Sequence, residues 1–278
     1  MTTIEPVKNY RFPTAHPRPE GSLAAWFSQA GILAGRQLLV VVRDVPTLLQ
    51  SLIVPGLSMI MFKVVLGDAV GSATGMNSAY GTVPLVIIIG AMFGSIASAA
   101  RLNIERMSGL LSRIYVLPIN RGADLTSRVI SELARILVTT LLLLAAGHLI
   151  GFRFTQGIGP AIGIVAVALA YGAAFAVLTL AAAVNVAPGA PLVPVISLLS
   201  TLMMFFNSGF SPVDMYPGWL QPIVANQPMT PAIEVMRAFA SGGPVAENLI
   251  KVSIWVVVII ALSTYPALRG YRKAATGR

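Results

Sequence analysis

The chain contains a run of 60 residues without Asp, Glu, Lys or Arg, from Phe154 to Val213. Such a run does not fit a water-soluble domain, in which about a quarter of the residues are charged. It is also too long for one helix across a hydrocarbon core about 30 Å thick, which takes about 20 residues. The segment from Asn185 to Pro191 divides the run, because its Pro and Gly residues mark a turn. The run therefore predicts two membrane-spanning helices.

The composition of the whole chain agrees with a polytopic membrane protein. Hydrophobic residues make up 56% of its 278 residues and charged residues 10%, which excludes disorder, because disorder needs low hydrophobicity and high charge. Cys is absent, so disulfides, thiolate metal sites and Cys nucleophiles are excluded. We predict an all-α membrane domain over residues 22–275, preceded by a disordered cytoplasmic tail at residues 1–21. Its six predicted transmembrane helices are residues 47–66, 82–100, 131–151, 160–184, 191–207 and 249–268.

The basic residues are divided unequally between the two sides of the membrane that six spans define. Of the 19 Lys and Arg residues, 14 lie on the side that carries both termini, four on the opposite side and one within a span. Cytoplasmic loops carry an excess of Lys and Arg. We therefore expect a multi-pass protein of the plasma (inner) membrane with both termini in the cytoplasm. The net charge of +9 then reflects orientation, and no nucleic-acid partner is expected.

Residues 22–44 have the pattern of an amphipathic helix that lies in the inner membrane interface. Ser22 is a suitable N-cap, and Arg36 and Arg43 fall where the lipid headgroups lie. Arg43 and Pro46 separate the segment from the first span. The alternative is a buried extension of that span. The apolar positions at helical spacing are Leu23, Trp26, Phe27, Ala30, Leu33 and Ala34.

Residues 101–128 form a long cytoplasmic loop with a predicted short amphipathic helix. Its charged residues Glu105, Arg106 and Arg113 lie away from the apolar stripe. A charged helix between two spans can serve as a docking surface for a soluble partner. The alternative is a solvated connector whose charges only set the topology. The apolar stripe consists of Ile104, Met107, Leu111 and Ile114, which follow helical spacing.

Residues 208–248 are expected on the outer side of the membrane. Their sequence predicts two short helices that form a re-entrant hairpin in the outer leaflet. Pro217 and Pro231 stand where a proline opens a helix, and Gly242 can end the second helix. Backbone at this depth must be covered by protein or by water. The alternative is a structural lid without any contact to a ligand.

The motifs of catalysis and nucleotide binding are absent. There is no Gly-x-x-x-x-Gly-Lys-Ser/Thr loop, no Gly-x-Ser-x-Gly elbow and no His-Glu-x-x-His motif, so we predict no catalytic residue, metal ligand or cofactor on this chain. Glu132 and Arg135 are expected to pair at the cytoplasmic interface, and Glu234 with Arg237 on the outer side, both at i, i+3. Two alternative functions remain. A lipid-modifying membrane enzyme needs catalytic residues, and an ion-coupled carrier needs ionisable groups at mid-membrane, where this sequence is apolar.

Met and Phe side chains in the predicted spans are the candidates for contact with an apolar ligand. Walls rich in these residues can repack around varied apolar molecules. For each residue the alternative is ordinary helix packing. The candidates are Met59, Phe62, Phe93, Met203 and Phe206.

Several motifs resemble those of a known family. The cytoplasmic stretch Glu105-Arg-x-x-Gly-Leu-Leu-x-Arg113 resembles the permease subunits of ABC-2 type exporters, and so does the outer stretch Ser208-Gly-Phe-x-Pro212. Within this class the chain resembles the daunorubicin-resistance (DrrB/DrrC-like) group, and mycobacterial DrrC-like subunits in particular. The patterns that carry this narrower resemblance are Gly151-Phe-Arg-Phe154, Tyr216-Pro-Gly-Trp219 and Gly242-Gly-Pro244.

The resemblance implies an architecture, partners and a cargo. It implies six spans with an N-terminal interfacial helix, a coupling helix between the second and third spans, and a re-entrant pair before the sixth. ATP and Mg would be bound by a separate P-loop ATP-binding subunit, present in two copies. A second permease, a DrrB-like chain or otherwise a second copy of this one, would complete the pathway. The implied cargo is lipophilic, an anthracycline-like drug or an envelope lipid, moved outward across the plasma membrane.

The resemblance also assigns roles to residues, which their spacing alone does not. Coupling to the ATP-binding subunit is implied for Glu105, Arg106, Gly109 and Arg113. An outer re-entrant gate is implied for Gly209, Pro212, Pro217, Trp219, Pro228 and Arg237.

Overall fold

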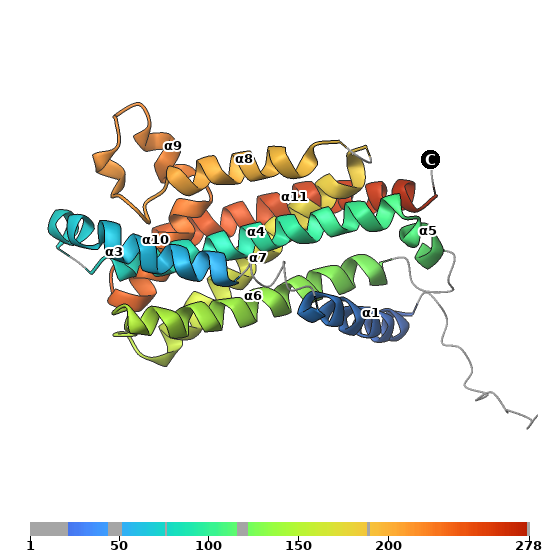
Figure 1. The fold of residues 1–278 in the computed structure, drawn as a ribbon, viewed down its shortest axis with the longest axis horizontal. Helices are drawn as coiled ribbons and strands as arrows, with labels where there is room; N and C mark the ends of the chain where they lie inside the picture. Colours follow the sequence, from blue (N-terminus) through green and yellow to red (C-terminus); the bar gives the residue numbers. More distant parts are fainter. Residues whose placement is uncertain (1–21, 44–51, 76, 116–121, 188–189, 277–278) are drawn as a thin grey trace, which may run out of the picture.

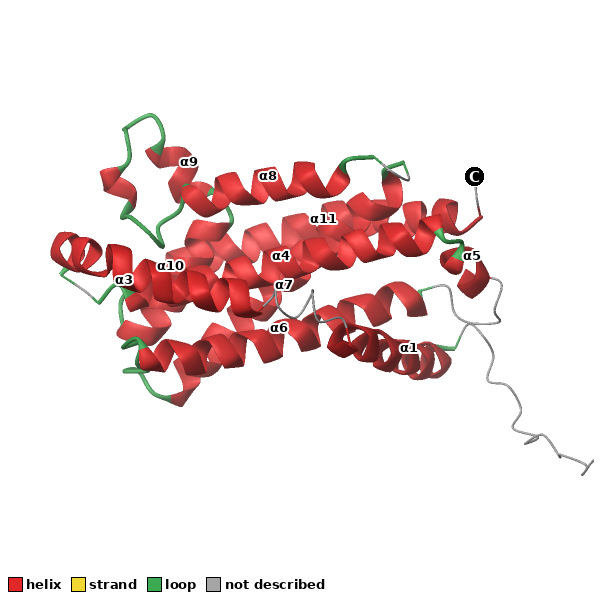
Figure 2. Ribbon diagram, in the orientation of Figure 1, coloured by secondary structure: helices red, strands yellow, loops and turns green. Residues whose placement is uncertain are grey.

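The computed structural model describes residues 22–43, 52–75, 77–115, 122–187 and 190–276. Within these ranges every regular element is a helix (Figure 2), which confirms the predicted all-α fold. The elements are α1 (Leu23–Arg43), α3 (Val54–Thr74), α4 (Ala79–Met107), α5 (Leu110–Tyr115), α6 (Ala123–Leu149), α7 (Ile158–Asn185), α8 (Leu192–Phe205), the 3₁₀ helix η2 (Val213–Met215), α9 (Gln221–Asn226), α10 (Met229–Ser241) and α11 (Ala246–Thr276).

α4 and α7 form the centre of an elongated bundle (Figure 1). α4 packs against α3, α6, α7, α8 and α10, and α7 packs against α6, α10 and α11. All residues from 81 to 92 in α4 are buried, because small and apolar side chains surround this part of the helix, and a helix that is apolar all round lies inside. The main core joins α4 to α7 and α10 through residues such as Ile88, Tyr171 and Met236.

Five helices among the described residues are long and apolar enough to cross a membrane: α1, α4, α6, α7 and α11. α4, α6, α7 and α11 correspond to four of the predicted spans, and each begins before its predicted start. The difference is largest in α6, which begins at Ala123 and not at residue 131. Asp124 and Arg128 lie in its first turns, so a search for charge-free stretches excluded them.

The other two predicted spans correspond to shorter apolar helices. The range 191–207 contains α8, whose 14 residues are fewer than the roughly 20 that cross a membrane. The first part of the range 47–66 lies outside the described residues. The helix in its second part, α3, continues beyond the predicted end until Gly75, whose φ of +68° ends it. The break predicted at the Pro- and Gly-containing segment is confirmed between α7 and α8.

α1 confirms the helix predicted for residues 22–44. The Ser22 hydroxyl caps it by accepting a hydrogen bond from the Ala25 N–H at 3.1 Å. Small residues such as Ala30 and Ala34 are buried, and α1 packs against α6. Large apolar side chains on the opposite face, such as Phe27 and Ile32, are exposed. Of the predicted apolar stripe, Ala30 and Ala34 are thus buried but Leu23 and Phe27 are exposed. The length and hydropathy of α1 also fit a span.

The amphipathic helix predicted around residues 104–114 is broken into two pieces. α4 continues to Met107, and α5 begins at Leu110 after Gly109, whose φ of +72° ends the first helix. Ile104 and Met107 are exposed whereas Leu111 is buried. The prediction of one continuous apolar stripe was therefore wrong, because the turn at Gly109 rotates the two halves relative to each other.

Residues 208–248, which are predicted to lie outside and which we call the outer segment, contain two short helices, α9 and α10, as predicted. These helices begin at other residues than predicted. Pro217 lies in a turn before α9, where its carbonyl accepts the Leu220 N–H. α10 begins at Met229, two residues before Pro231. Gly242, with a φ of +92°, ends α10 as predicted. Most of α10 is buried against α4 and α7, so it is part of the core.

The two ends of the bundle carry different elements. α5 and the C-terminal end of α11 lie at one end, and α9 and the connection between α6 and α7 lie at the other (Figure 1). We call these the α5 end and the α9 end. The segments predicted to be cytoplasmic and those predicted to be external are thus separated along the long axis.

Candidate functional site

The inward face of α6 is polar and its outward face is apolar. The buried polar residues of α6 are Asp124, Ser127, Arg128, Ser131, Glu132, Arg135, Thr139 and Thr140. The exposed large apolar residues of α6 are Ile130, Leu137, Val138, Leu141, Leu142 and Leu149. In a membrane, an apolar face can lie against lipid while ionisable groups face the inside of the bundle, where they mark functional sites.

Glu132 and Arg135 connect α6 to α4. Arg135 donates to Glu132 at 2.7 Å, which confirms the predicted pair. The guanidinium also donates to the Gly90 and Ala91 carbonyls of α4 at 3.4 and 3.3 Å. The pair is buried within the bundle, which its spacing in the sequence did not reveal; its predicted position at the cytoplasmic interface stays a prediction.

Gly94 makes room for this arrangement. A Cβ atom at this position would overlap the Arg135 guanidinium. On the other side of the pair, the Glu132 carboxylate accepts hydrogen bonds from Ser95, at 3.5 Å, and from Ser98. α4 therefore offers a small residue where the arginine lies and hydroxyl donors where the glutamate lies.

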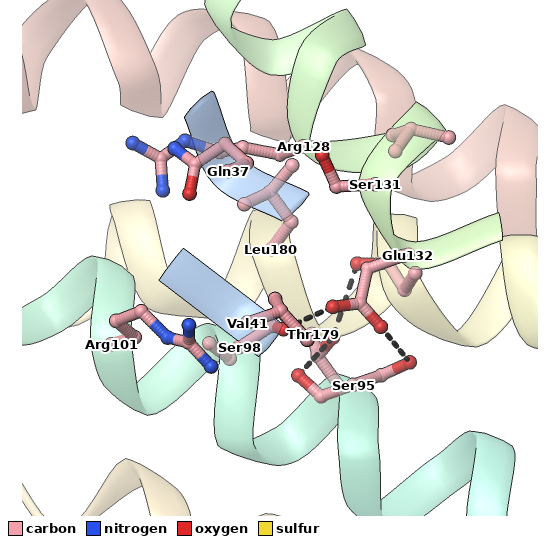
Figure 3. A pocket seen from close by; sticks show the side chains of 13 residues that line it. Gln37, Val41, Ser95, Ser98, Arg101, Arg128, Ser131, Glu132, Thr179 and Leu180 are labelled. Atoms are coloured by element: carbon pink, nitrogen blue, oxygen red, sulfur yellow. Dashed lines mark hydrogen bonds between the residues drawn. The ribbon is translucent and has the colours of Figure 1, made fainter. Parts of the chain in front are cut away.

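A cavity of about 40 Å³ lies beside this pair, between α1, α4, α6 and α7. Most of its wall area is apolar, but we call it the polar cavity because Gln37, Ser95 and Glu132 line it. In Figure 3 the Glu132 carboxylate points toward Ser95 and Ser98, with Gln37 of α1 on the other side of the cavity. Apolar groups close it in part. The lining residues are Gln37, Val41, Ser95, Ser98, Ala99, Arg101, Arg128, Val129, Ser131, Glu132, Ala176, Thr179 and Leu180.

A second cluster of charges joins α4, α6 and α11 at the α5 end. Arg128 donates to Glu105 at 2.6 Å and to Asp124 at 2.8 Å. Asp124 also accepts a hydrogen bond from the Tyr271 hydroxyl at 2.7 Å. Arg106 donates to the Val186 carbonyl just after α7, at 2.6 Å. The last turns of α4 are thus tied to three other helices.

The residues predicted to couple to an ATP-binding subunit divide into two groups. Glu105 and Arg106 are partly buried and bond to α6 and to the end of α7. Gly109 forms the turn between α4 and α5. Arg113 is exposed on α5. Within this set, Arg113 is the side chain that a partner can reach, and Glu105 and Arg106 hold the segment in place.

The predicted gate residues Gly209 and Arg237 lie together near the start of α4. Arg237 donates to Glu234 at 2.8 Å, which confirms that predicted pair, and to the Ser208 carbonyl at 2.7 Å. A Cβ atom at Gly81 would lie 2.6 Å from the Gly209 carbonyl oxygen. α4 therefore approaches the backbone of Gly209 closely only because residue 81 is a glycine.

The other predicted gate residues lie elsewhere in the outer segment. Pro212 and Pro217 flank η2 and its following turn, Pro228 is the N-cap residue of α10, and Trp219 is 74% exposed. Tyr216, between the two turns, donates to the Asn207 carbonyl at 2.9 Å. Burial raises the pKa of the Tyr216 phenol, so the phenol stays protonated as a donor at neutral pH.

The five candidates for contact with an apolar ligand lie on α3, α4 and the end of α8. Met59 is fully buried, and Phe206 is 41% exposed. Phe62, Phe93 and Met203 are partly buried against the main core. None of the five lines the polar cavity. Phe62 packs edge to face on Phe210 of the outer segment, with ring centres 4.6 Å apart.

Comparison with known proteins identifies the family. Residues 28–239 match the family described as "ABC-2 type transporter", which is more than two thirds of the chain. The chain belongs to the ABC-2 type transporter family. This membership, and the match along most of the sequence, agree with the resemblance inferred from the cytoplasmic and outer motifs.

The relatives of this ABC-2 family member carry permease names. The chain is 36% identical over 264 residues, covering 95% of both chains, to a Mycobacterium tuberculosis protein named "Probable doxorubicin resistance ABC transporter permease protein DrrC". It is 28% identical to the "Doxorubicin resistance ABC transporter permease protein DrrB" of the same organism, over 70% of this chain and 71% of that one. It is 25% identical to the "Daunorubicin resistance ABC transporter permease protein DrrB1" of Streptomyces coeruleorubidus, over 70% and 69%. The chain is an ABC transporter permease subunit.

The polar face of α6 is the feature that sequence reasoning missed. Its signal was present, because polar residues recur at helical spacing through positions 124, 128, 131, 132 and 135. Spans were delimited by the absence of charge, so the first two turns of α6 were assigned to the loop. A search for helices with a polar stripe and an apolar face would have included them.

Proposed function

We propose that this permease is the membrane-spanning part of an ATP-driven exporter of lipophilic compounds, such as anthracycline-like drugs or envelope lipids. The observation that carries the proposal is the similarity over 95% of both chains to a relative named as a doxorubicin resistance permease. ATP and Mg would be bound by a separate P-loop subunit in two copies. A DrrB-like permease, or otherwise a second copy of this chain, would form the other half of the pathway.

The proposed topology keeps six spans, formed by α3, α4, α6, α7, α8 and α11, with α1 in the inner interface. α8 has only 14 residues, so residues that flank this helix would complete its crossing. Both termini and the α5 end would lie in the cytoplasm. The charge distribution along the sequence supports this orientation. α3 and α8 expose apolar side chains such as Leu57, Ile60, Leu198 and Leu202, which would face lipid or the second permease.

In the proposed mechanism α5 docks on the ATP-binding subunit and moves with it. Glu105 and Arg106 would carry this movement to α6 and to the end of α7, because they bond directly to both. The cargo would pass along α3, α4 and the end of α8, where the Met and Phe candidates lie, and leave beside the re-entrant segment. The close approach of Gly81, Gly209 and Arg237 supports a gate at that place.

The test is the variant Arg113→Glu in the complete complex, with the ATP-binding subunit and the second permease, reconstituted in liposomes. We expect the charge reversal on exposed α5 to weaken binding of the ATP-binding subunit and to reduce ATP-dependent transport in parallel. Arg153→Glu, at the exposed connection between α6 and α7, is the matched control and should leave both unchanged. Unaltered subunit binding and transport in Arg113→Glu would refute docking through α5. Transport driven by a proton gradient without ATP would refute the ATP-driven exporter itself.

A further inference from the structure

The polar cavity beside Glu132 and Arg135 contains a buried hydrogen-bonding group that the protein does not satisfy. Gln37 of α1 is 6% exposed, and its Nε2 atom has no hydrogen-bond partner within the described part of the chain. The side chain lines the cavity. A buried donor without a partner costs about 1–3 kcal/mol, so the cavity calls for an occupant that can accept from Gln37.

The charges around the cavity balance, which favours a neutral occupant. Arg101 and Arg128 line the cavity, and Arg135 is paired with Glu132, which also lines it. Three carboxylates lie among these three cations, since Glu105 and Asp124 pair with Arg128 and Glu132 pairs with Arg135. An added ion would leave an uncompensated charge in a low-dielectric site, which is expensive.

The size and chemistry of the cavity fit water. A water molecule needs roughly 10–15 Å³ of such space and two to four polar partners, and the cavity measures about 40 Å³. The walls offer both kinds of partner, since Gln37 donates and the Glu132 carboxylate and the Thr179 hydroxyl can accept. A lipid headgroup or a drug-sized molecule is too large.

We propose that this cavity is an internal hydration site, holding about two or three waters, that attaches α1 to α4 and α6. The direct contacts of α1 with the bundle are mostly those of small apolar residues, together with a hydrogen bond of 3.3 Å from Ser131 to the Ala34 carbonyl. Bridging waters hold two groups nearly as well as a direct bond and exchange partners readily. α1 can therefore shift against α4 when α5 moves. This second part rests on the proposed function.

The test of hydration is radiolytic hydroxyl-radical footprinting of the protein in nanodiscs, in which waters bound in place oxidise adjacent side chains. Leu180 lines the cavity and is 9% exposed, whereas Leu125 is 8% exposed and does not line it. We expect Leu180 to be oxidised several-fold faster than Leu125. Equal rates would overturn the hydration site.

Gln37→Met tests the residue that anchors the water. Methionine keeps the length of the side chain and removes its hydrogen-bonding groups, so we expect oxidation of Leu180 to fall toward that of Leu125. Ser28→Met, at an exposed position of the same helix and outside the lining, is the control and should change nothing. An unchanged Leu180 rate in Gln37→Met would overturn the role of Gln37.

A separate measurement tests the movement of α1. In the complete complex, Gln37→Met should reduce the amount of cargo transported per ATP hydrolysed while subunit assembly is preserved, and Ser28→Met should leave this ratio unchanged. If Leu180 oxidation falls in Gln37→Met, which shows that water has left the cavity, but the variant still transports fully, the proposed movement of α1 is overturned. Footprinting does not depend on transport. It therefore tests the hydration site even if the proposed export function is wrong.

Discussion

At the scale of single residues, glycines in α4 decide which polar groups can approach this helix. Gly94 admits the Arg135 guanidinium, and Gly81 admits the re-entrant backbone at Gly209. Neither position has a positive φ, so the requirement is for space and not for an unusual backbone conformation. Small residues have the same use at helix contacts within membranes, where they let polar groups and backbones come close.

Gly94→Ala should destabilise the protein. The new Cβ would overlap Arg135 and force it away from its partners, and overpacking of this kind costs about 1–3 kcal/mol. The measurement is the thermal unfolding midpoint in detergent. Gly35→Ala is the control, since its Cβ would meet nothing within 4 Å, and an alanine in a helix gains about 0.5–1 kcal/mol over glycine. A midpoint that rises in both variants would contradict the conclusion that Gly94 provides the space for Arg135.

The sequence predicted the Glu132–Arg135 and Glu234–Arg237 pairs correctly, because both members of each lie one helical turn apart. It could not predict that the first pair is buried. That burial depends on Gly90, Ala91 and Gly94 of another helix, and spacing within α6 contains no information about them. Gln37 is a similar case, since a glutamine on an amphipathic helix gives no sign that its amide lies over a cavity.

At the scale of elements, α4 is one continuous helix that ends at the turn before α5. Its first part contacts the backbone of Gly209 near Gly81, its middle contacts Arg135, and its last turns carry Glu105 and Arg106. In the proposed mechanism, a continuous helix with these three attachments would transmit a displacement from one end to the other. The prediction of a separate amphipathic helix around residues 104–114 hid this continuity, because apolar spacing does not reveal which glycine ends a helix.

Glu105→Gln tests the attachment of α4 to α6. The carboxylate is only 12% exposed in its pair with Arg128, and hydrogen bonds to charged groups contribute about 1.5–3 kcal/mol. We expect a loss of thermal stability of that order, with weaker coupling of ATP hydrolysis to transport in the complete complex. Glu247→Gln breaks an exposed i, i+4 pair with Lys251 and should have no measurable effect. Equal effects of the two variants would argue against a coupling role for the buried cluster.

At the scale of the whole molecule, the two ends of the bundle differ in the chemistry they present. The α5 end carries the charged cluster of Glu105, Asp124 and Arg128, and the α9 end carries the proline-rich outer segment. The distribution of basic residues along the sequence predicted this difference between the two ends. The positions of charged residues can be read from the sequence without knowing how the helices pack. The sequence predicted the lengths of α3 and α8 less well, because apolar character alone does not fix where a helix ends.

The absence of Cys makes the orientation directly testable with single-cysteine variants. Ser211 and Ser241 lie in the outer segment and Ser108 lies beside the turn before α5, so the proposed topology puts the first two outside and the third in the cytoplasm. On intact cells, a membrane-impermeant maleimide should label Ser211→Cys and Ser241→Cys but not Ser108→Cys. After lysis it should label Ser108→Cys as well, which controls for its reactivity. Labelling of Ser108→Cys on intact cells, with Ser211→Cys reacting only after lysis, would invert the topology and move α5 away from any cytoplasmic ATP-binding subunit.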